Sequence, residues 1–179
     1  MRYATTSLVS SLTGLSTTQL REWTNRRALV PADVPPAGRG SPAKFTWQTV
    51  LIICVAATLK TDFRLELQSY RGLFSGLRTS LHQKSFVAIW NKKLVIEPSG
   101  DWTLTNIDDD IDSPGDVLVI QLRPHLETLA EGFAISPPPT GSGQLDLFPA
   151  QIVDDIRKSD DRTNMESQIA GNRDQRKTA

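Results

Sequence analysis

The sequence predicts an α+β fold, with helices in its N-terminal part, a small antiparallel β-rich segment after them and a disordered C-terminal tail. Three observations support this. Apolar residues recur at helical spacing between Leu8 and Leu81, short β-prone segments follow from residue 85, and the chain beyond residue 136 is dominated by Pro, Gly and charged residues. We therefore divide the 179 residues into segments 1–83, 84–135 and 136–179.

The first two helices are short and are separated by a glycine turn. Residues 5–12 begin with hydroxyl residues that can cap a helix, and Leu8, Val9 and Leu12 share one face. Thr13-Gly14-Leu15-Ser16 is a tight turn, and Ser16 can cap a second helix over residues 17–28 that buries Leu20 and Trp23. Two short helices joined in this way are typical of a helix-turn-helix unit.

A loop and a third helix follow. Residues 31–43 hold four Pro and two Gly, which excludes a regular element there. Thr46 can cap a helix over residues 47–60, whose apolar run from Val50 to Leu59 is the predicted core and is too short to span a bilayer. Cys54 lies inside this run and is interpreted as an inert packing thiol.

A second apolar pattern begins at Asp62 and repeats at steps of three and four. Two interpretations stay open: a short dimer contact, or packing against the chain's own core. The residues of this seam are Phe63, Leu67, Tyr70, Phe74, Leu77 and Leu81, with Gly72 and Gly76 between them.

The β-rich segment comes next. We expect strands over residues 85–90, 93–97, 101–107 and 117–122, then a short helix over 124–134. The acidic loop at 108–115 lacks the ligand spacing and Gly of an EF-hand and is interpreted as solvated. Residues 136–143 have the composition of a flexible linker, and the tail beyond Ile156 is expected to be disordered.

Charge and composition narrow the function. The formal net charge is zero, yet residues 1–84 carry a net charge of +7 and residues 85–179 one of −7. This division favours nucleic-acid binding by the basic N-terminal half of the chain. One Cys and two His, His82 and His125, do not make a metal site, and no catalytic or cofactor motif is present, so we expect neither an enzyme nor a cofactor protein. The N-terminal residues lack the basic-then-apolar pattern of a leader, so we expect a cytoplasmic, nucleoid-associated bacterial protein.

The first 70 or so residues resemble the winged helix-turn-helix of the MerR family of transcription regulators. The resemblance rests on Thr13-Gly14-Leu15-Ser16, Leu20-Arg21-Glu22-Trp23, Leu29-Val30-Pro31, the Gly38-Arg39-Gly40 wing and Lys44-Phe45-Thr46 before the apolar helix. Three features depart from the family: Ala28 replaces a common Gly, the wing is longer and richer in Pro, and the long dimerisation helix is shortened or absent. The resemblance implies duplex DNA binding as a homodimer, transcription regulation and action on RNA polymerase.

A recognition helix must present short polar and basic side chains to the major groove and to phosphates. Lys44 lies at the base of the wing, and Arg39, between two glycines, can approach the duplex closely. The resemblance adds Trp23, in place of an aromatic packed near the DNA backbone, and assigns a DNA contact to Arg21. The alternative to a DNA contact is that these basic residues form an ordinary solvated surface. The residues of the second helix that fit are Ser16, Thr17, Thr18, Gln19, Arg21, Asn25 and Arg26.

The tail contains Gln144-Leu145-Asp146-Leu147-Phe148 directly after the linker. This pentapeptide resembles the segment by which bacterial polymerases and repair proteins dock on the DNA sliding clamp, with Leu147 and Phe148 entering an apolar pocket. It creates a second hypothesis, an accessory factor of replication or of a mobile element. The alternative is a terminal segment folded back onto the domain.

Overall fold

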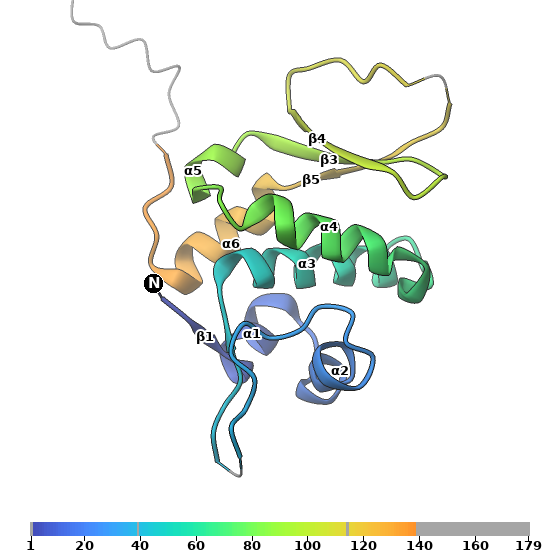
Figure 1. The fold of residues 1–179 in the computed structure, drawn as a ribbon. Coiled ribbons are helices and arrows are strands. Elements are labelled where there is room, and N and C mark those ends of the chain that lie inside the picture. The colour runs from blue at the N-terminus through green and yellow to red at the C-terminus, as the bar shows by residue number, and fades with distance from the viewer. Residues whose placement is uncertain (1, 39, 114, 139–179) are drawn as a thin grey trace, which may run out of the picture. The chain divides into compact units, whose positions relative to one another are not determined.

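The computed structural model describes residues 2–38, 40–113 and 115–138 (Figure 1). Most of the helices come before a run of three strands, and the strands form two small antiparallel sheets, so the predicted α+β class is confirmed. Arg39 and the residues of the tail pentapeptide, 144–148, lie outside the described residues.

The N-terminal elements are β1 (Ala4–Thr5), α1 (Thr6–Thr13) and α2 (Thr17–Arg21). The Thr5 hydroxyl caps α1 by accepting from the Leu8 amide at 3.4 Å. Gly14 ends α1 with a φ of 68°, a left-handed conformation that glycine adopts without strain. The two helices and the glycine turn predicted here are confirmed.

The second helix differs from its prediction in its C-terminal half. The α-helix ends at Arg21 and continues as a π-helix, η1 (Glu22–Arg26), in which the Arg27 amide donates to the Glu22 carbonyl at 2.8 Å. The wider turn accompanies the burial of two consecutive side chains, Trp23 and Thr24. Leucine spacing alone could not reveal this change of hydrogen-bond register.

Strand pairing joins the two ends of the loop that follows η1. β2 (Lys44–Phe45) pairs antiparallel with β1, and Val34 forms an isolated bridge with Lys44 through hydrogen bonds of 3.0 and 3.1 Å. Between Val34 and Lys44 the described residues form no further regular element, as the Pro and Gly content predicts. We call residues 33–44 the wing loop.

The central element is α3 (Trp47–Thr61), which lies between the α1–α2 pair and α4 in Figure 1. The Thr46 hydroxyl caps it by accepting from the Thr49 amide at 3.4 Å. Every residue from Thr49 to Ala57 is buried, and Val50 and Ile53 are completely so. A helix that is apolar on all sides is expected only where other elements cover all of its faces.

The seam of residues 63–81 becomes η2 (Leu67–Tyr70), a 3₁₀ turn, followed by α4 (Arg71–Leu81). Leu67, Phe74, Leu77 and Leu81 are at most 2% exposed within the chain's own core, which favours the second of the two interpretations. Gly76 allows α4 to lie close to the sheet, since a Cβ there would stand 2.9 Å from the Trp102 ring.

The strand predicted over residues 85–90 is wrong, because this segment forms the short helix α5 (Phe86–Ile89). The Ser85 hydroxyl caps it by accepting from the Ala88 amide at 3.3 Å. Phe86, Ile89 and Trp90 turn into the core at helical spacing, whereas Ala88, which alternation would bury, is exposed. The sequence fits both periods over so few residues, and the serine cap decides between them.

The remaining strands form one sheet in the order β4-β3-β5, with β3 (Lys92–Ile96) between β4 (Trp102–Asn106) and β5 (Leu118–Gln121). These strands match three of the predicted segments, and α6 (Arg123–Phe133) matches the predicted last helix. Leu94 and Ile96 of the sheet and Leu126 of α6 belong to the same buried cluster as α3. The predicted segments 1–83 and 84–135 therefore share one core.

Candidate nucleic-acid interface

The candidate recognition helix α2 begins at a reciprocal cap. The Ser16 hydroxyl accepts from the Gln19 amide at 3.2 Å, and the Ser16 amide donates to Gln19 Oε1 at 3.1 Å. Such a capping box fixes the residue at which a helix begins. It also occupies the Gln19 carbonyl oxygen, which leaves only the Nε2 group of that side chain to reach a base.

α2 and η1 have one buried face and one exposed face. Leu20 is fully buried and Trp23 is 8% exposed. Trp23 is therefore a core residue that holds the helix in place, and its predicted role at the DNA backbone is not supported by its position. The predicted contact residues on the other face are exposed: Ser16, Thr17, Thr18, Gln19, Arg21, Asn25 and Arg26.

The arginines of this face differ in their partners. Arg26 Nη1 lies 3.4 Å from Glu22 Oε2, and Arg27 Nε lies 3.1 Å from Glu22 Oε1. Arg27 also faces Glu66 at 3.6 Å. Arg21 has no ion pair within the part of the chain that the structure describes. Of the three, Arg21 needs to break no ion pair in order to meet a phosphate.

A single carboxylate organises the root of the wing loop. Asp33 Oδ2 accepts from the Thr46 amide at 2.7 Å and from the Thr46 hydroxyl at 3.1 Å, while Oδ1 accepts from the Thr49 hydroxyl at 3.0 Å and from Arg78 Nη2 at 3.1 Å. Arg78 Nη1 also donates to the Pro31 carbonyl at 2.6 Å. The wing loop, the start of α3 and α4 are thereby held together.

This network could not be predicted from the sequence. Asp33 and Arg78 are 45 residues apart, and neither belongs to a motif. Lys44, by contrast, is exposed at the base of the wing loop, where the sequence predicted it. Its backbone is used for pairing with Val34, so its side chain is what remains for a ligand.

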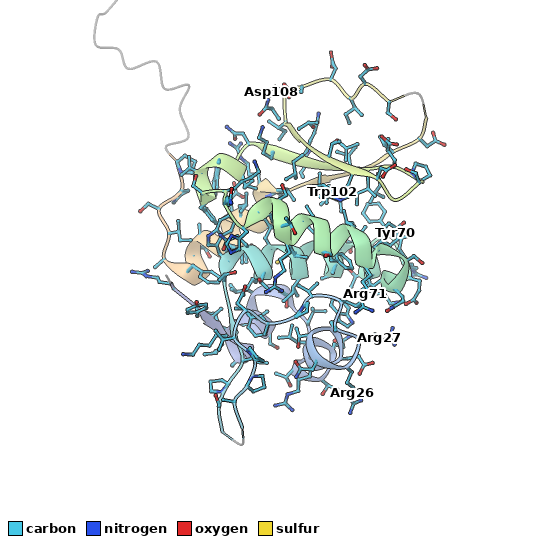
Figure 2. All side chains as sticks on the ribbon, viewed as in Figure 1. Arg26, Arg27, Tyr70, Arg71, Trp102 and Asp108 are labelled. Carbon is cyan, nitrogen blue, oxygen red and sulfur yellow. The ribbon has the colours of Figure 1, made fainter. Side chains whose placement is uncertain are left out.

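The acidic loop stands away from this region. Figure 2 shows Arg26 and Asp108 at opposite ends of the unit formed by residues 1–138. Lys93, 9% exposed, reaches from the sheet to the loop and donates to the carbonyls of Ile107 and Asp109 at 3.2 and 2.5 Å. A buried ammonium group thus ties down the start of the loop.

The remaining side chains with possible chemical roles are the Cys54 thiol and the potential metal ligands. Burial raises the pKa of the Cys54 thiol to about 12, so the thiol stays protonated at neutral pH. Within the described ranges, no three His, Cys, Asp or Glu side chains lie close enough together to hold a metal ion. Nor does any helix in those ranges have the length and apolar character needed to cross a bilayer.

The sequence was also compared with models of protein families and with curated proteins, and neither comparison gave a match.

Proposed function

We propose that residues 1–83 bind duplex DNA, with the exposed face of α2 and η1 in the major groove and the wing loop beside it. The observation that carries the proposal is the pairing of a capped helix, polar on its exposed face, with a Pro- and Gly-rich loop whose two ends are joined by a β-bridge. Helix-turn-helix proteins read DNA with a helix of this kind, and wings contact the adjacent backbone.

The anchoring of α2 supports the proposal. A helix that is capped at Ser16 and buried at Leu20 and Trp23 keeps its orientation when exposed side chains meet a base edge. Little conformational entropy is then lost on binding, since the backbone is already ordered. Arg21 and Lys44, both exposed, supply the positive charge that phosphates require.

The particular role we propose is that of a MerR-like transcription regulator. Within the first 70 or so residues, the chain carries the order of turn, recognition helix, wing and apolar helix seen in that family. The resemblance adds two expectations: binding as a homodimer to pseudo-palindromic sites, and action on RNA polymerase at a promoter. Because most of the 63–81 seam is buried in the chain's own core, such a dimer would have to form elsewhere.

Arg21→Ala tests the interface directly. We expect it to weaken binding to a pool of random-sequence duplexes by about ten-fold, because a charged contact in the groove is lost. The double variant Arg21→Ala/Arg39→Ala should abolish binding, as the sequence resemblance implies. Fluorescence anisotropy measures the affinity, and thermal unfolding followed by circular dichroism checks the fold.

The matched control is Lys84→Ala, which removes one exposed charge after the end of α4. It should change affinity less than Arg21→Ala does. Equal losses in the two variants would mean that only net charge matters and would refute a specific interface at α2.

A second candidate function rests on the pentapeptide at 144–148. Gln144, Leu147 and Phe148 match a clamp-docking segment in type and spacing, and a Pro- and Gly-rich stretch separates them from the last described helix. The protein would then bring the sliding clamp to a DNA site, or compete for it. Pull-down with purified clamp, comparing the chain with Leu147→Ala/Phe148→Ala, tests this, and equal recovery would rule it out.

A further inference from the structure

A cavity of about 290 Å³ separates α4 from the segment that follows η1. One wall is made by Ala28, Leu29, Val30 and Pro31. The other is one face of α4, with Arg71, Phe74, Ser75 and Arg78 at steps of three, one and three residues. Leu29, Val30 and Phe74 are at most 4% exposed, so the floor is apolar and the polar groups stand at the rim.

The two arginines of the rim are in different states. Arg78 is held at one end by Pro31 and Asp33. Arg71 is exposed at the other end and has no ion pair within the residues described. Figure 2 shows Arg71 on the same flank as Arg27, which approaches the start of η2 through its ion pair with Glu66.

The local charge favours an anion. No acid is among the residues that line the cavity, and two acids of the adjoining segments are paired: Asp33 accepts from Arg78, and Glu66 faces Arg27 and Lys60 at 3.6 and 3.8 Å. Arg71, which has no ion pair within the residues described, therefore adds a positive charge one helical turn before Ser75 on the same face of α4. A guanidinium with a hydroxyl donor nearby matches a phosphate, whose oxygens accept several charge-assisted hydrogen bonds at once.

We propose that this cavity binds a phosphate group, with Arg71 as its main ligand and Ser75 as a second donor. The group could be carried by a duplex or by a small molecule, and the experiment separates these two sources. The duplex arm rests on the proposed function, whereas the small-molecule arm does not. A ligand here would contact both α4 and the residues directly after the recognition helix.

Titration of the ¹⁵N-labelled full chain with orthophosphate, against sodium chloride of equal ionic strength, tests the site. We expect saturable shifts, with a millimolar dissociation constant, at the amides of residues 28–30 and 71–78. Arg71→Ala and Ser75→Leu should both remove them. Ser75→Leu removes the hydroxyl and adds bulk to the cavity lining without a change of charge, so shifts that survive it would mean surface association and would overturn the proposal.

Duplex binding of Arg71→Ala and Lys84→Ala, measured by anisotropy, identifies the source. A several-fold loss in Arg71→Ala alone, with a salt slope lower by about one, indicates a duplex phosphate. Equal affinities, with orthophosphate shifts that persist when duplex is bound, indicate a small molecule. A wild-type chain that binds orthophosphate but no duplex would refute the proposed function and leave this site standing. The absence of both effects overturns the site.

Discussion

The Asp33 side chain joins the wing loop to the start of α3 and to α4. Its two oxygens accept four hydrogen bonds, and three of the donors, the Thr46 amide and the hydroxyls of Thr46 and Thr49, belong to residues that are at most 6% exposed. A buried donor that loses its acceptor has no water to replace it. The carboxylate is therefore a structural residue, although its position in the wing loop could suggest a role in binding.

Asp33→Ala should lower the free energy of unfolding by about 2–4 kcal/mol, because it leaves buried donors and the Arg78 guanidinium without their acceptor. Urea denaturation measures the change. Asp108→Ala, at an exposed site in the acidic loop, is the control and should stay within about 0.5 kcal/mol of wild type. A similar small effect in Asp33→Ala would show that the network contributes little to stability.

At the scale of elements, the sequence predicted well where a pattern was long or where a cap was present. The 15-residue helix α3 was predicted from a continuous apolar run behind Thr46, and its observed start agrees. The errors fell on short segments. Residues 86–89 satisfy strand and helix periodicities alike, and the π-turn of η1 depends on how Trp23 and Thr24 pack against distant residues.

In the candidate site, too, the features set by local sequence pattern could be predicted and those set by packing between distant segments could not. The exposed face of α2 follows from local periodicity, so its residues could be predicted from the sequence. The ion pair of Arg26 with Glu22 could have been suspected from its spacing of four residues. The pair of Arg27 with Glu22, at a spacing of five, could not, because it accompanies the π-turn. The contacts of Arg78 and the cavity beside Arg71 depend on how α4 lies against the wing loop, which no local pattern records.

The packing of α6 against the end of α3 makes stability depend on pH. Burial lowers the pKa of His125 from its usual 6.5, and the nearby Asp62 carboxylate opposes this shift only in part. With the pKa lowered in the folded state, the unfolded chain binds the proton first as pH falls. The contribution of His125 is therefore complete above pH 6.5 and is lost as pH falls from there toward the folded-state pKa.

His125→Gln should flatten this part of the stability profile, because the side chain no longer titrates. Urea denaturation at a series of pH values between neutral and mildly acidic measures the slope. His82→Gln, at an exposed position after α4, is the comparison. If the two variants lose the same pH dependence, burial of His125 is not its cause.

At the scale of the whole described unit, α6 packs against α1 and α3, and α1 in turn packs against α2. Leu126 and Leu129 of α6 are fully buried, and they share a core with α3 and α1. Gly132 of α6 lies so close to α1 that a Cβ there would stand 2.7 Å from the Leu12 side chain. Removal of α6 would expose apolar faces of both helices to water.

A fragment of residues 1–83 should therefore fail to fold cooperatively, while residues 1–138 should unfold in one transition. Circular dichroism with heating, together with the dispersion of amide signals, distinguishes the two. A sharp transition in the short fragment would show that residues 1–83 can fold as an independent domain.

The Arg78 bridge has a mechanical consequence. The Arg78 guanidinium donates to the Pro31 carbonyl and to the Asp33 carboxylate. On the same helix, a Cβ at Gly76 would stand 2.9 Å from the Trp102 ring. A side chain at position 76 could be accommodated only if α4 or the Trp102 ring moved. A shift of α4 away from the sheet would carry Arg78 with it, and so would disturb the start of the wing loop although that loop is distant in sequence.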